Sequence, residues 1–291
     1  MASLRELRRK VKSVKSTQQI TRAMKMVAAA RLNKAQERIM LARPYAQKIE
    51  HLLEEVATLN RHANADVPFH HPFLEKRESR RIDVLVVTAD RGLCGGFNAA
   101  VVRKTVQFLK DHADGDVHLW VIGKKGRDYF RRYRIPIEKE YMNFFSRLSF
   151  AQADILGKDL TEAFLATGTR EIAVIYNEFK SRLQSQLIVK TLIPVADIPD
   201  VKPAQDFLYE PSKEKLLEEL FPAYFKNQLF RILLESQSAE LAARMTAMDN
   251  ATTNASDLIS SLTLTMNKVR QAGITKEILE IVGGAEALQA G

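Results

Sequence analysis

The sequence predicts an α/β protein in which a long antiparallel coiled coil of the N- and C-terminal helices accompanies a central α/β domain. Residues 3–58 contain no glycine and one proline, Pro44, and residues 223–272 contain neither residue type. Between these ends, in roughly 77–210, runs of β-branched residues alternate with helical patterns. Uninterrupted helical ends around an alternating strand and helix pattern indicate two kinds of architecture in one chain.

The N-terminal part, residues 1–60, is predicted to be one long helix. A kink or an interruption is expected at Pro44, because proline removes a backbone donor from the helix. Apolar residues recur at alternating spacings of three and four, the heptad pattern of a coiled-coil seam. The apolar seam positions are Leu4, Leu7, Val11, Val14, Ala28, Leu32, Ala35, Ile39, Ala42, Ala46, Ile49, Leu53 and Val56.

The middle of this seam is polar. Three successive seam positions lack an apolar residue, and apolar residues stand beside them instead. We therefore expect the apolar face of the helix to rotate locally here. The polar seam positions are Gln18, Thr21 and Lys25, and the flanking apolar residues are Ile20, Met24 and Val27.

The C-terminal part, residues 212–288, shows a second seam with the same spacing. A helix of about 55 residues is about 80 Å long, and no small domain covers such a length. Since the two helices lie at opposite ends of one chain, an antiparallel intramolecular pair is the simplest arrangement. The second seam comprises Leu241, Met245, Met248, Thr252, Ala255, Ile259, Leu262, Met266, Val269 and Gly273.

The segment Thr246–Asp257 consists almost entirely of Ala, Ser, Thr, Asn and Asp, with Met248 as the exception. Several of these are poor helix formers, because their short polar side chains compete for the backbone. Two interpretations stay open. The coiled coil is locally weak in this segment, or the small side chains make the helix pair narrow enough to pass through a close-fitting hole.

The central part, residues 77–210, is predicted to form a largely parallel sheet covered by helices on both faces. Residues 61–80 and 194–211 are expected to be exposed linkers. The predicted strands are Ile82–Thr88, Val117–Gly123, Ile172–Asn177 and Gln186–Pro194, and the predicted helices are Asn98–His112, Lys124–Tyr133 and Phe150–Thr167.

The positive charge lies at one end of the chain. Residues 1–48 hold 13 cations and two acids, whereas the whole chain has a net charge of +9. An acidic partner for this helix is therefore expected. Nucleic acid is an alternative partner, but Tyr45 is the only aromatic residue in the first 60, so stacking platforms for bases are missing. A mitochondrial presequence is a further interpretation of a basic N-terminus.

The sequence contains no recognised set of catalytic residues. The loop Asp90–Asn98 follows a predicted strand and leads into a helix, where a Rossmann domain holds a phosphate, but its glycine spacing fits neither nucleotide-binding motif. Cys94 would need a nearby base to act as a nucleophile. His70 and His71 lack further ligands to complete a metal site. We expect no cofactor and no metal, and the single cysteine fits a reducing compartment.

Three blocks together resemble the gamma subunits of F-type (rotary) ATP synthases. They are Ser13–Leu32 (SVKSTQQITRAMKMVAAARL), Thr88–Asn98 (TADRGLCGGFN) and Glu240–Leu288, which ends NKVRQAGITKEILEIVGGAEAL. They follow the family's order along nearly the full chain. The resemblance implies a central rotor shaft without an active site, in which the central domain is a Rossmann-like platform.

The resemblance also implies partners. The terminal helices would turn inside a ring of alpha and beta subunits, and the platform would sit with the epsilon subunit on the membrane c ring. Met24, Lys25, Arg270 and Gln271 match contacts to loops of the catalytic subunits, and Phe207, Leu208, Tyr209 and Glu210 match the foot that faces the c ring and epsilon.

The resemblance further implies no nucleic-acid partner and an indirect, peripheral association with the membrane. Because the matching pattern starts near Met1, the presequence interpretation falls away. We expect the cytoplasmic face of a bacterial plasma (inner) membrane. Gly273 stands where the family has alanine-like residues, so local loosening of the helix is expected there.

Overall fold

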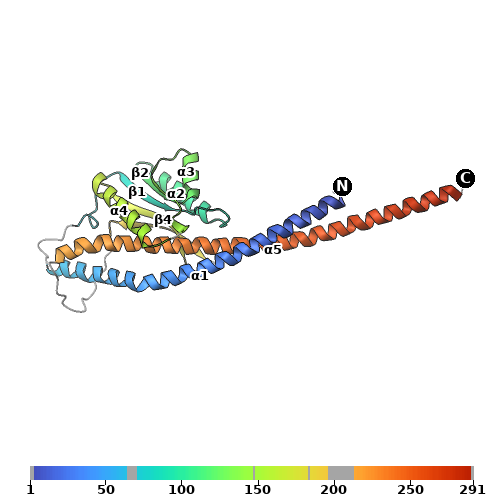
Figure 1. Cartoon of the computed structure of the whole chain (residues 1–291). Helices are drawn as coiled ribbons and strands as arrows, with labels where there is room; N and C mark the ends of the chain where they lie inside the picture. The colour runs from blue at the N-terminus through green and yellow to red at the C-terminus, as the bar shows by residue number, and fades with distance from the viewer. Residues whose placement is uncertain (1–2, 64–70, 147, 183, 196–212, 290–291) are drawn as a thin grey trace. The chain divides into compact units, whose positions relative to one another are not determined.

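The computed structural model describes residues 3–63, 71–146, 148–182, 184–195 and 213–289 (Figure 1). The elements are α1 (Leu4–Ala63), β1 (Arg81–Val87), α2 (Phe97–Asp111), β2 (Asp116–Ile122), α3 (Lys124–Arg132), β3 (Ile137–Tyr141), a 3₁₀ turn (Phe144–Ser146), α4 (Phe150–Thr167), β4 (Glu171–Phe179), β5 (Ser185–Ile193) and α5 (Lys213–Gln289).

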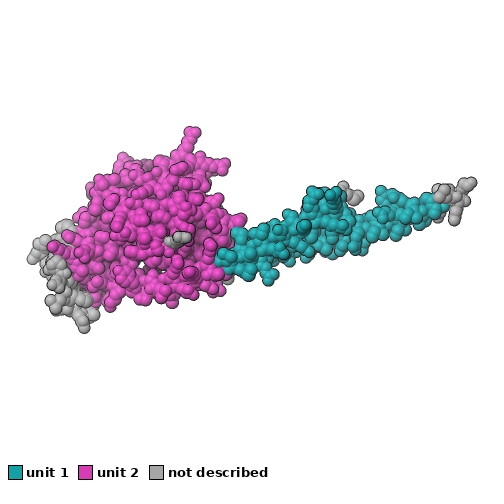
Figure 2. Space-filling model, in the orientation of Figure 1, with its two compact units in different colours: residues 1–28, 245–291 teal, residues 29–244 magenta. Residues whose placement is uncertain are grey.

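The chain divides into two compact units (Figure 2). Unit 1 comprises residues 1–28 and 245–291, and unit 2 comprises residues 29–244. Both long helices contribute residues to both units. Each unit is described by itself.

Unit 1 is an antiparallel helix pair. Thr21 lies opposite Thr252 and Lys25 lies opposite Asp249, so α5 numbers fall as α1 numbers rise. Every seam position predicted for α1 in this unit is buried or half-buried. The predicted seam is therefore confirmed for α1, and the seam positions of α5 from Met245 to Val269 are likewise buried or half-buried. The last predicted seam position, Gly273, is exposed, so the prediction is wrong there.

The sheet of unit 2 has the strand order β3-β2-β1-β4-β5. β1 pairs in parallel with β2 and β4, β2 pairs in parallel with β3, and only the β4–β5 pair is antiparallel. The largely parallel sheet is therefore confirmed. β4 and β5 are antiparallel because the short connection between them allows a hairpin but no crossover.

Helices cover both faces of this sheet, as predicted. On one face α2 and α3 enclose a core of Val84, Val86, Leu119 and Phe130, among others. On the other face α4 and the unit 2 parts of α1 and α5 pack on the sheet (Figure 1). The alternation along β1 supplies both cores, because successive strand residues point to opposite faces.

Helix α4 has the predicted bounds because both of its ends are specified locally. Ser149 and Gln152 form a capping box at its start. Gly168 ends it with a left-handed conformation, φ 64°, which glycine adopts without steric cost.

Three expectations need correction. Of the two alternatives expected at Pro44, the interruption is wrong, because α1 is helical on both sides of the proline; the kink stays a prediction. The strand β3 was not predicted. The segment 61–80 is not an exposed linker throughout, since His71 and Phe73 are 8% and 2% exposed and Phe73 belongs to a core cluster. The aromatic side chains of this stretch draw it onto the domain.

Among the described residues, no helix combines the length and the apolar character needed to cross a lipid bilayer.

Candidate partner-contact surfaces

The seam of unit 1 contains a polar layer. The hydroxyl oxygens of Thr21 and Thr252 are 2.8 Å apart, and the Lys25 ammonium donates to Asp249 Oδ1 at 2.6 Å. Thr21 is only 8% exposed. Because Thr21 and Lys25 find partners across the pair, they stay in the seam.

The expected rotation of the apolar face is therefore wrong. Ile20 and Val27, which would enter the seam in a rotated helix, are 57% and 53% exposed. Met26, on another side of the helix, is 60% exposed. Unit 1 thus carries large apolar side chains on its outside where its seam is polar, and such side chains are available to a partner.

The small-residue segment Thr246–Asp257 is helical throughout. Met248 and Ala255 are buried in the seam at 5% and 8% exposure. The Thr252 hydroxyl donates to the Met248 carbonyl at 2.7 Å and also meets Thr21, so its polar group is satisfied within the helix pair. Packing against α1 therefore overrides the weak helix propensity of these residues.

Of the site residues predicted in α1, Met24 and Lys25 are both half-buried. The side chain of Lys25 is 40% exposed and is engaged with Asp249. Met24 lies between the exposed Ala23 and the seam residue Lys25.

The predicted site residues of α5, Arg270 and Gln271, are exposed. The antiparallel pairing places Val269 at the level where α1 begins, at Leu4. Beyond it no described residue of α1 lies opposite α5, and residues 270–285 are all exposed. Among them, Ile274, Ile278 and Leu279 are 49%, 54% and 66% exposed.

The structure brings Met24 and Lys25 together on α1, and Arg270 and Gln271 together on α5. Phe207, Leu208, Tyr209 and Glu210, the predicted foot, lie outside the described residues.

The glycine-containing loop 90–98 of unit 2 is held in place by hydrogen bonds to neighbouring segments of the chain. Asn98 Oδ1 accepts from the Ala89 N–H at 2.9 Å, and Asp90 Oδ1 accepts from the Asn143 N–H at 3.0 Å. Arg244 of α5 donates to the Gly92 carbonyl at 2.7 Å. No sequence pattern could predict this contact, because Arg244 is distant from the loop in the chain. The loop is a tight strand-to-helix turn held by side chains.

Cys94 in this loop is 2% exposed, and Asn98 Nδ2 donates to its Sγ at 3.1 Å. Burial, followed by the nearby Glu240 carboxylate, raises the pKa of the Cys94 thiol. A raised pKa keeps the thiol protonated, which is the opposite of what a nucleophile needs.

His71 is a core residue. Its ring stacks on Phe221 with the centroids 4.3 Å apart, and its Nδ1 accepts from the Phe73 N–H at 3.1 Å. Burial lowers its pKa to about 4, against the raising effect of Glu75. The described residues contain no group of three or more His, Cys, Asp or Glu side chains arranged to hold a metal ion. His70 lies outside the described residues.

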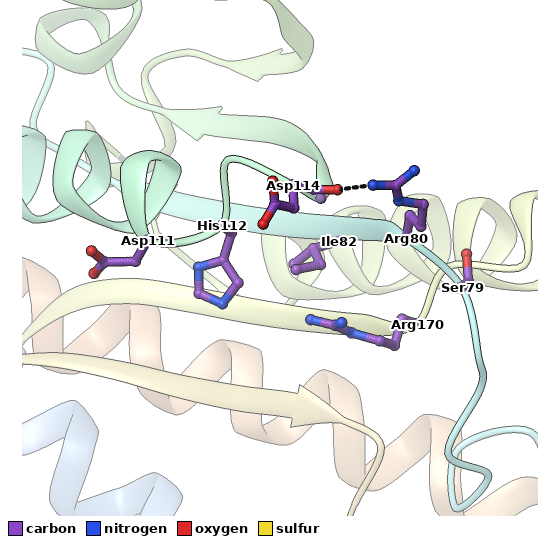
Figure 3. Close-up of a pocket in the computed structure, with 8 residues that line it drawn as sticks. Ser79, Arg80, Ile82, Asp111, His112, Asp114 and Arg170 are labelled. Atoms are coloured by element: carbon purple, nitrogen blue, oxygen red, sulfur yellow. Dashed lines mark hydrogen bonds between the residues drawn. The ribbon is translucent and has the colours of Figure 1, made fainter.

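A pocket of about 290 Å³ opens at the amino ends of β1 and β4 (Figure 3). Arg80 and Arg170 line it together with Asp111 and Asp114, and Arg80 donates to the Asp114 carbonyl at 2.8 Å. Its charges balance, and ligands of open α/β sheets bind at the opposite, carboxyl edge. We assign no chemistry to it.

Residues 3–288 match the family model described as ATP synthase. An ATP synthase gamma chain from an Anaeromyxobacter species is 46% identical over 99% of this chain and 100% of its own length. One from Chloroherpeton thalassium is 43% identical over 99% of each chain.

Solved structures show the same fold. A chain from the central stalk and c-ring of the Tetrahymena thermophila mitochondrial ATP synthase has 25% identity and a TM-score of 0.60 over 80% of this chain and 99% of its own. A chain of the Euglena gracilis mitochondrial ATP synthase, at 22% identity, has a TM-score of 0.73 over 99% and 95%.

Proposed function

The chain belongs to the family of ATP synthase gamma chains, and we propose that it is the central rotor shaft of an F-type ATP synthase. Its turning couples proton or sodium flow through the membrane c ring to ATP synthesis or hydrolysis in a ring of alpha and beta subunits. By the same coupling it regulates ATPase activity and ion flow. The chain itself is non-catalytic and binds no cofactor.

The observation that carries this proposal is the helix pair of unit 1. Its seam passes through small or hydrogen-bonded residues, which keeps the pair narrow where Thr21 meets Thr252. Past Val269 α5 continues without a described residue of α1 beside it, and every residue from 270 to 285 is exposed. A slender pair that ends in a single helix presents different surfaces to different sides of an enclosing ring, and rotary coupling needs that asymmetry.

The contacts to the catalytic subunits are assigned to both helices. Met24 and Lys25 face an acidic loop of a catalytic subunit, for which the basic N-terminal helix provides the opposite charge. Arg270 and Gln271 bond another such loop, and the planar guanidinium of Arg270 suits carboxylate and carbonyl acceptors. The exposure of the Arg270 and Gln271 side chains supports this assignment.

The remaining partners are the c ring and the epsilon subunit. Phe207, Leu208, Tyr209 and Glu210 form the foot that faces both. The chain then associates with the membrane only through these subunits, on the cytoplasmic face of a bacterial plasma membrane, and it has no nucleic-acid partner.

The first experiment is affinity purification of this chain from gently solubilised native membranes, with the recovered subunits weighed and ATP hydrolysis assayed. Recovery in a large ATPase that contains two related ring subunits supports the rotor. Recovery alone, or with nucleic acid that high salt removes, contradicts it.

A second experiment tests the assigned contact. Met24→Lys adds a long cation beside the proposed acidic loop, and we expect fewer ions pumped per ATP hydrolysed while the isolated chain stays folded. The matched control is Met40→Lys, at a methionine of the same helix that is 63% exposed and has no assigned contact. Normal ion pumping by the Met24→Lys variant would contradict the assignment of Met24 to this contact.

A further inference from the structure

Helix α3 and the two residues after it form the most basic stretch of unit 2. Residues 124–134 read KKGRDYFRRYR, with six cations and one acid. The helix buries Gly126 and Phe130 against the sheet. Of its charged side chains, Lys125, Asp128, Arg131 and Arg132 are exposed, whereas Lys124 and Arg127 are half-buried.

Two of the six cations already have carboxylate partners. Arg127 binds Asp128 at 2.7 Å and Arg131 binds Glu140 at 2.8 Å. Among the described residues, no salt bridge involves the other four cations. These four, Lys124, Lys125, Arg132 and Arg134, are called the α3 basic face.

The two lysines occupy an unfavourable position. They are the first two residues of α3, whose first turn contains no acidic side chain. The N-terminus of a helix carries partial positive charge and disfavours cations. The Asp90 carboxylate offsets only part of this positive charge, because its Oδ1 accepts from the Lys124 N–H at 3.3 Å.

The position of Arg134 is unfavourable for a different reason, namely its backbone conformation. It has φ 54°, in the left-handed region, at the position that ends α3. The N–H of Arg134 bonds the Arg131 carbonyl at 3.1 Å and the N–H of Ile135 bonds the Phe130 carbonyl at 2.9 Å, a helix ending in which glycine is the usual residue. Both ends of α3 thus carry cations where local structure disfavours them, and such conflicts concentrate at functional sites.

We propose that the α3 basic face is a docking surface for a partner protein with two separated groups of carboxylates. The lysine pair and the arginine pair stand at opposite ends of the helix, about 12 Å apart at 1.5 Å per residue. This surface is additional to the helix-pair contacts of the proposed rotor, and the proposed function does not require it.

The charges between the two pairs favour a protein over a polyphosphate. Asp128 and Glu140 lie between them, paired with Arg127 and Arg131. A continuous phosphate backbone would cross these carboxylates, whereas carboxylates on a folded protein can be spaced to avoid them. Bases would also find a single exposed ring on this stretch, since Tyr133 is 59% exposed whereas Tyr129 is half-buried and packs on Tyr133 with the ring centroids 4.6 Å apart.

The decisive experiment uses the native complex and a carbodiimide, which joins a lysine amine only to a carboxylate that already touches it. Mass spectrometry of the products should show Lys124 or Lys125 linked to an Asp or Glu of another protein. In the isolated chain the same lysines should react freely with an acetylating reagent, and in the complex they should be protected. Lys158, exposed on α4 and paired with Asp154, is the reference lysine.

Variants test whether the face contributes to binding. Lys124→Gln/Lys125→Gln/Arg132→Gln should release the partner at roughly half the salt concentration that the native complex withstands, because fewer charge pairs hold it. The matched control removes three cations of the neighbouring helix, Arg103→Gln/Lys104→Gln/Lys110→Gln, and should leave the salt dependence unchanged. Equal salt dependence of the two variants overturns the proposal.

Arg134→Gly separates docking from folding. Glycine relieves the left-handed strain, so the melting temperature of the chain should rise by about 2–4 °C while the complex becomes more salt-sensitive. A variant that gains thermal stability and keeps full salt resistance counts against Arg134 as a docking residue.

Two further outcomes overturn the proposal. The first is lysines that stay as reactive in the complex as in the isolated chain, with no carbodiimide product to another protein. The second is protection that appears only on addition of duplex DNA or phosphatidylglycerol vesicles. Either can occur in an intact rotary ATPase, so failure here is distinguishable from failure of the proposed function.

Discussion

Unit 1 and the sheet domain of unit 2 use different means of stability. In unit 1 the described side chains that are under a tenth exposed are Leu7, Thr21, Ala28, Met248 and Ala255. The sheet domain instead has two apolar clusters, one on each face of the sheet, that include fully buried rings such as Phe130 and Phe164. Burial of apolar area is the main stabilising term of a domain. The sheet domain is therefore the stable element, and unit 1 has more surface available to partners.

Glycine substitutions should separate the two regions most strongly. Gly123 has φ 92°, and a Cβ there would lie 2.2 Å from the Thr88 carbonyl oxygen. We expect Gly123→Ala to destabilise the sheet domain by at least about 3 kcal/mol. Urea unfolding followed by the fluorescence of Trp120, the single tryptophan of the chain, measures this.

The matched change in unit 1, in the part of α5 beyond its pairing with α1, should have the opposite sign. Gly273 is helical and exposed, with no atom within 4 Å of an added Cβ. Gly273→Ala should add about 1 kcal/mol of helix stability, seen by circular dichroism at 222 nm without a change in the tryptophan transition. A loss of helicity would mean that Gly273 serves a purpose that the structure does not explain.

Acid should destabilise the sheet domain through His71. Its pKa is lowered to about 4 in the fold, against about 6.5 in an unfolded chain. The unfolded state therefore takes up a proton first, so the contribution of His71 is complete above pH 6.5 and is lost as the pH falls toward 4. Protonation would also remove the acceptor for the Phe73 N–H.

The variant His71→Phe keeps a ring against Phe221 but cannot titrate. Urea midpoints of both proteins between pH 7 and 4 should differ in slope, with the smaller decrease in the variant. Parallel slopes would mean that carboxylates, not His71, govern the acid sensitivity of this domain.

The smallest effect concerns the ion pair of unit 1. Lys25 and Asp249 are 40% and 52% exposed, so their pair should contribute about 0.2–1 kcal/mol and weaken in 1 M salt. Lys25→Asp and Asp249→Lys should each lower helix-pair stability, and the double exchange should restore it. A coupling energy near zero in this double-mutant cycle would show that the two side chains lie close together without stabilising the helix pair.

The exchanged pair Lys276→Glu/Glu280→Lys is the control. It reverses an i,i+4 pair on α5 with 78% and 65% exposure, beyond the level where α1 begins. Any change here should be smaller than at Lys25, because no second helix is bridged.

The periodic features of this protein could be predicted from its sequence. The seam of α1 was predicted residue by residue, because a 3.5-residue repeat fixes which side chains share one face of a helix. The bounds of α4 were equally local, set by Ser149, Gln152 and Gly168. The absence of a nucleotide-binding motif in the loop 90–98 was also readable directly from the spacing of its glycines.

Other features depend on residues that are distant in the chain and meet through the fold. β3 has three charged residues among its five, IEKEY, and is a strand because β2 offers it an edge to pair with. Thr21 stays in the seam because Thr252, 231 positions away, offers its hydroxyl. Arg244 fixes the loop 90–98 from α5. Periodicity is a property of neighbouring residues, whereas the satisfaction of a polar group depends on what the fold brings within 3 Å of it.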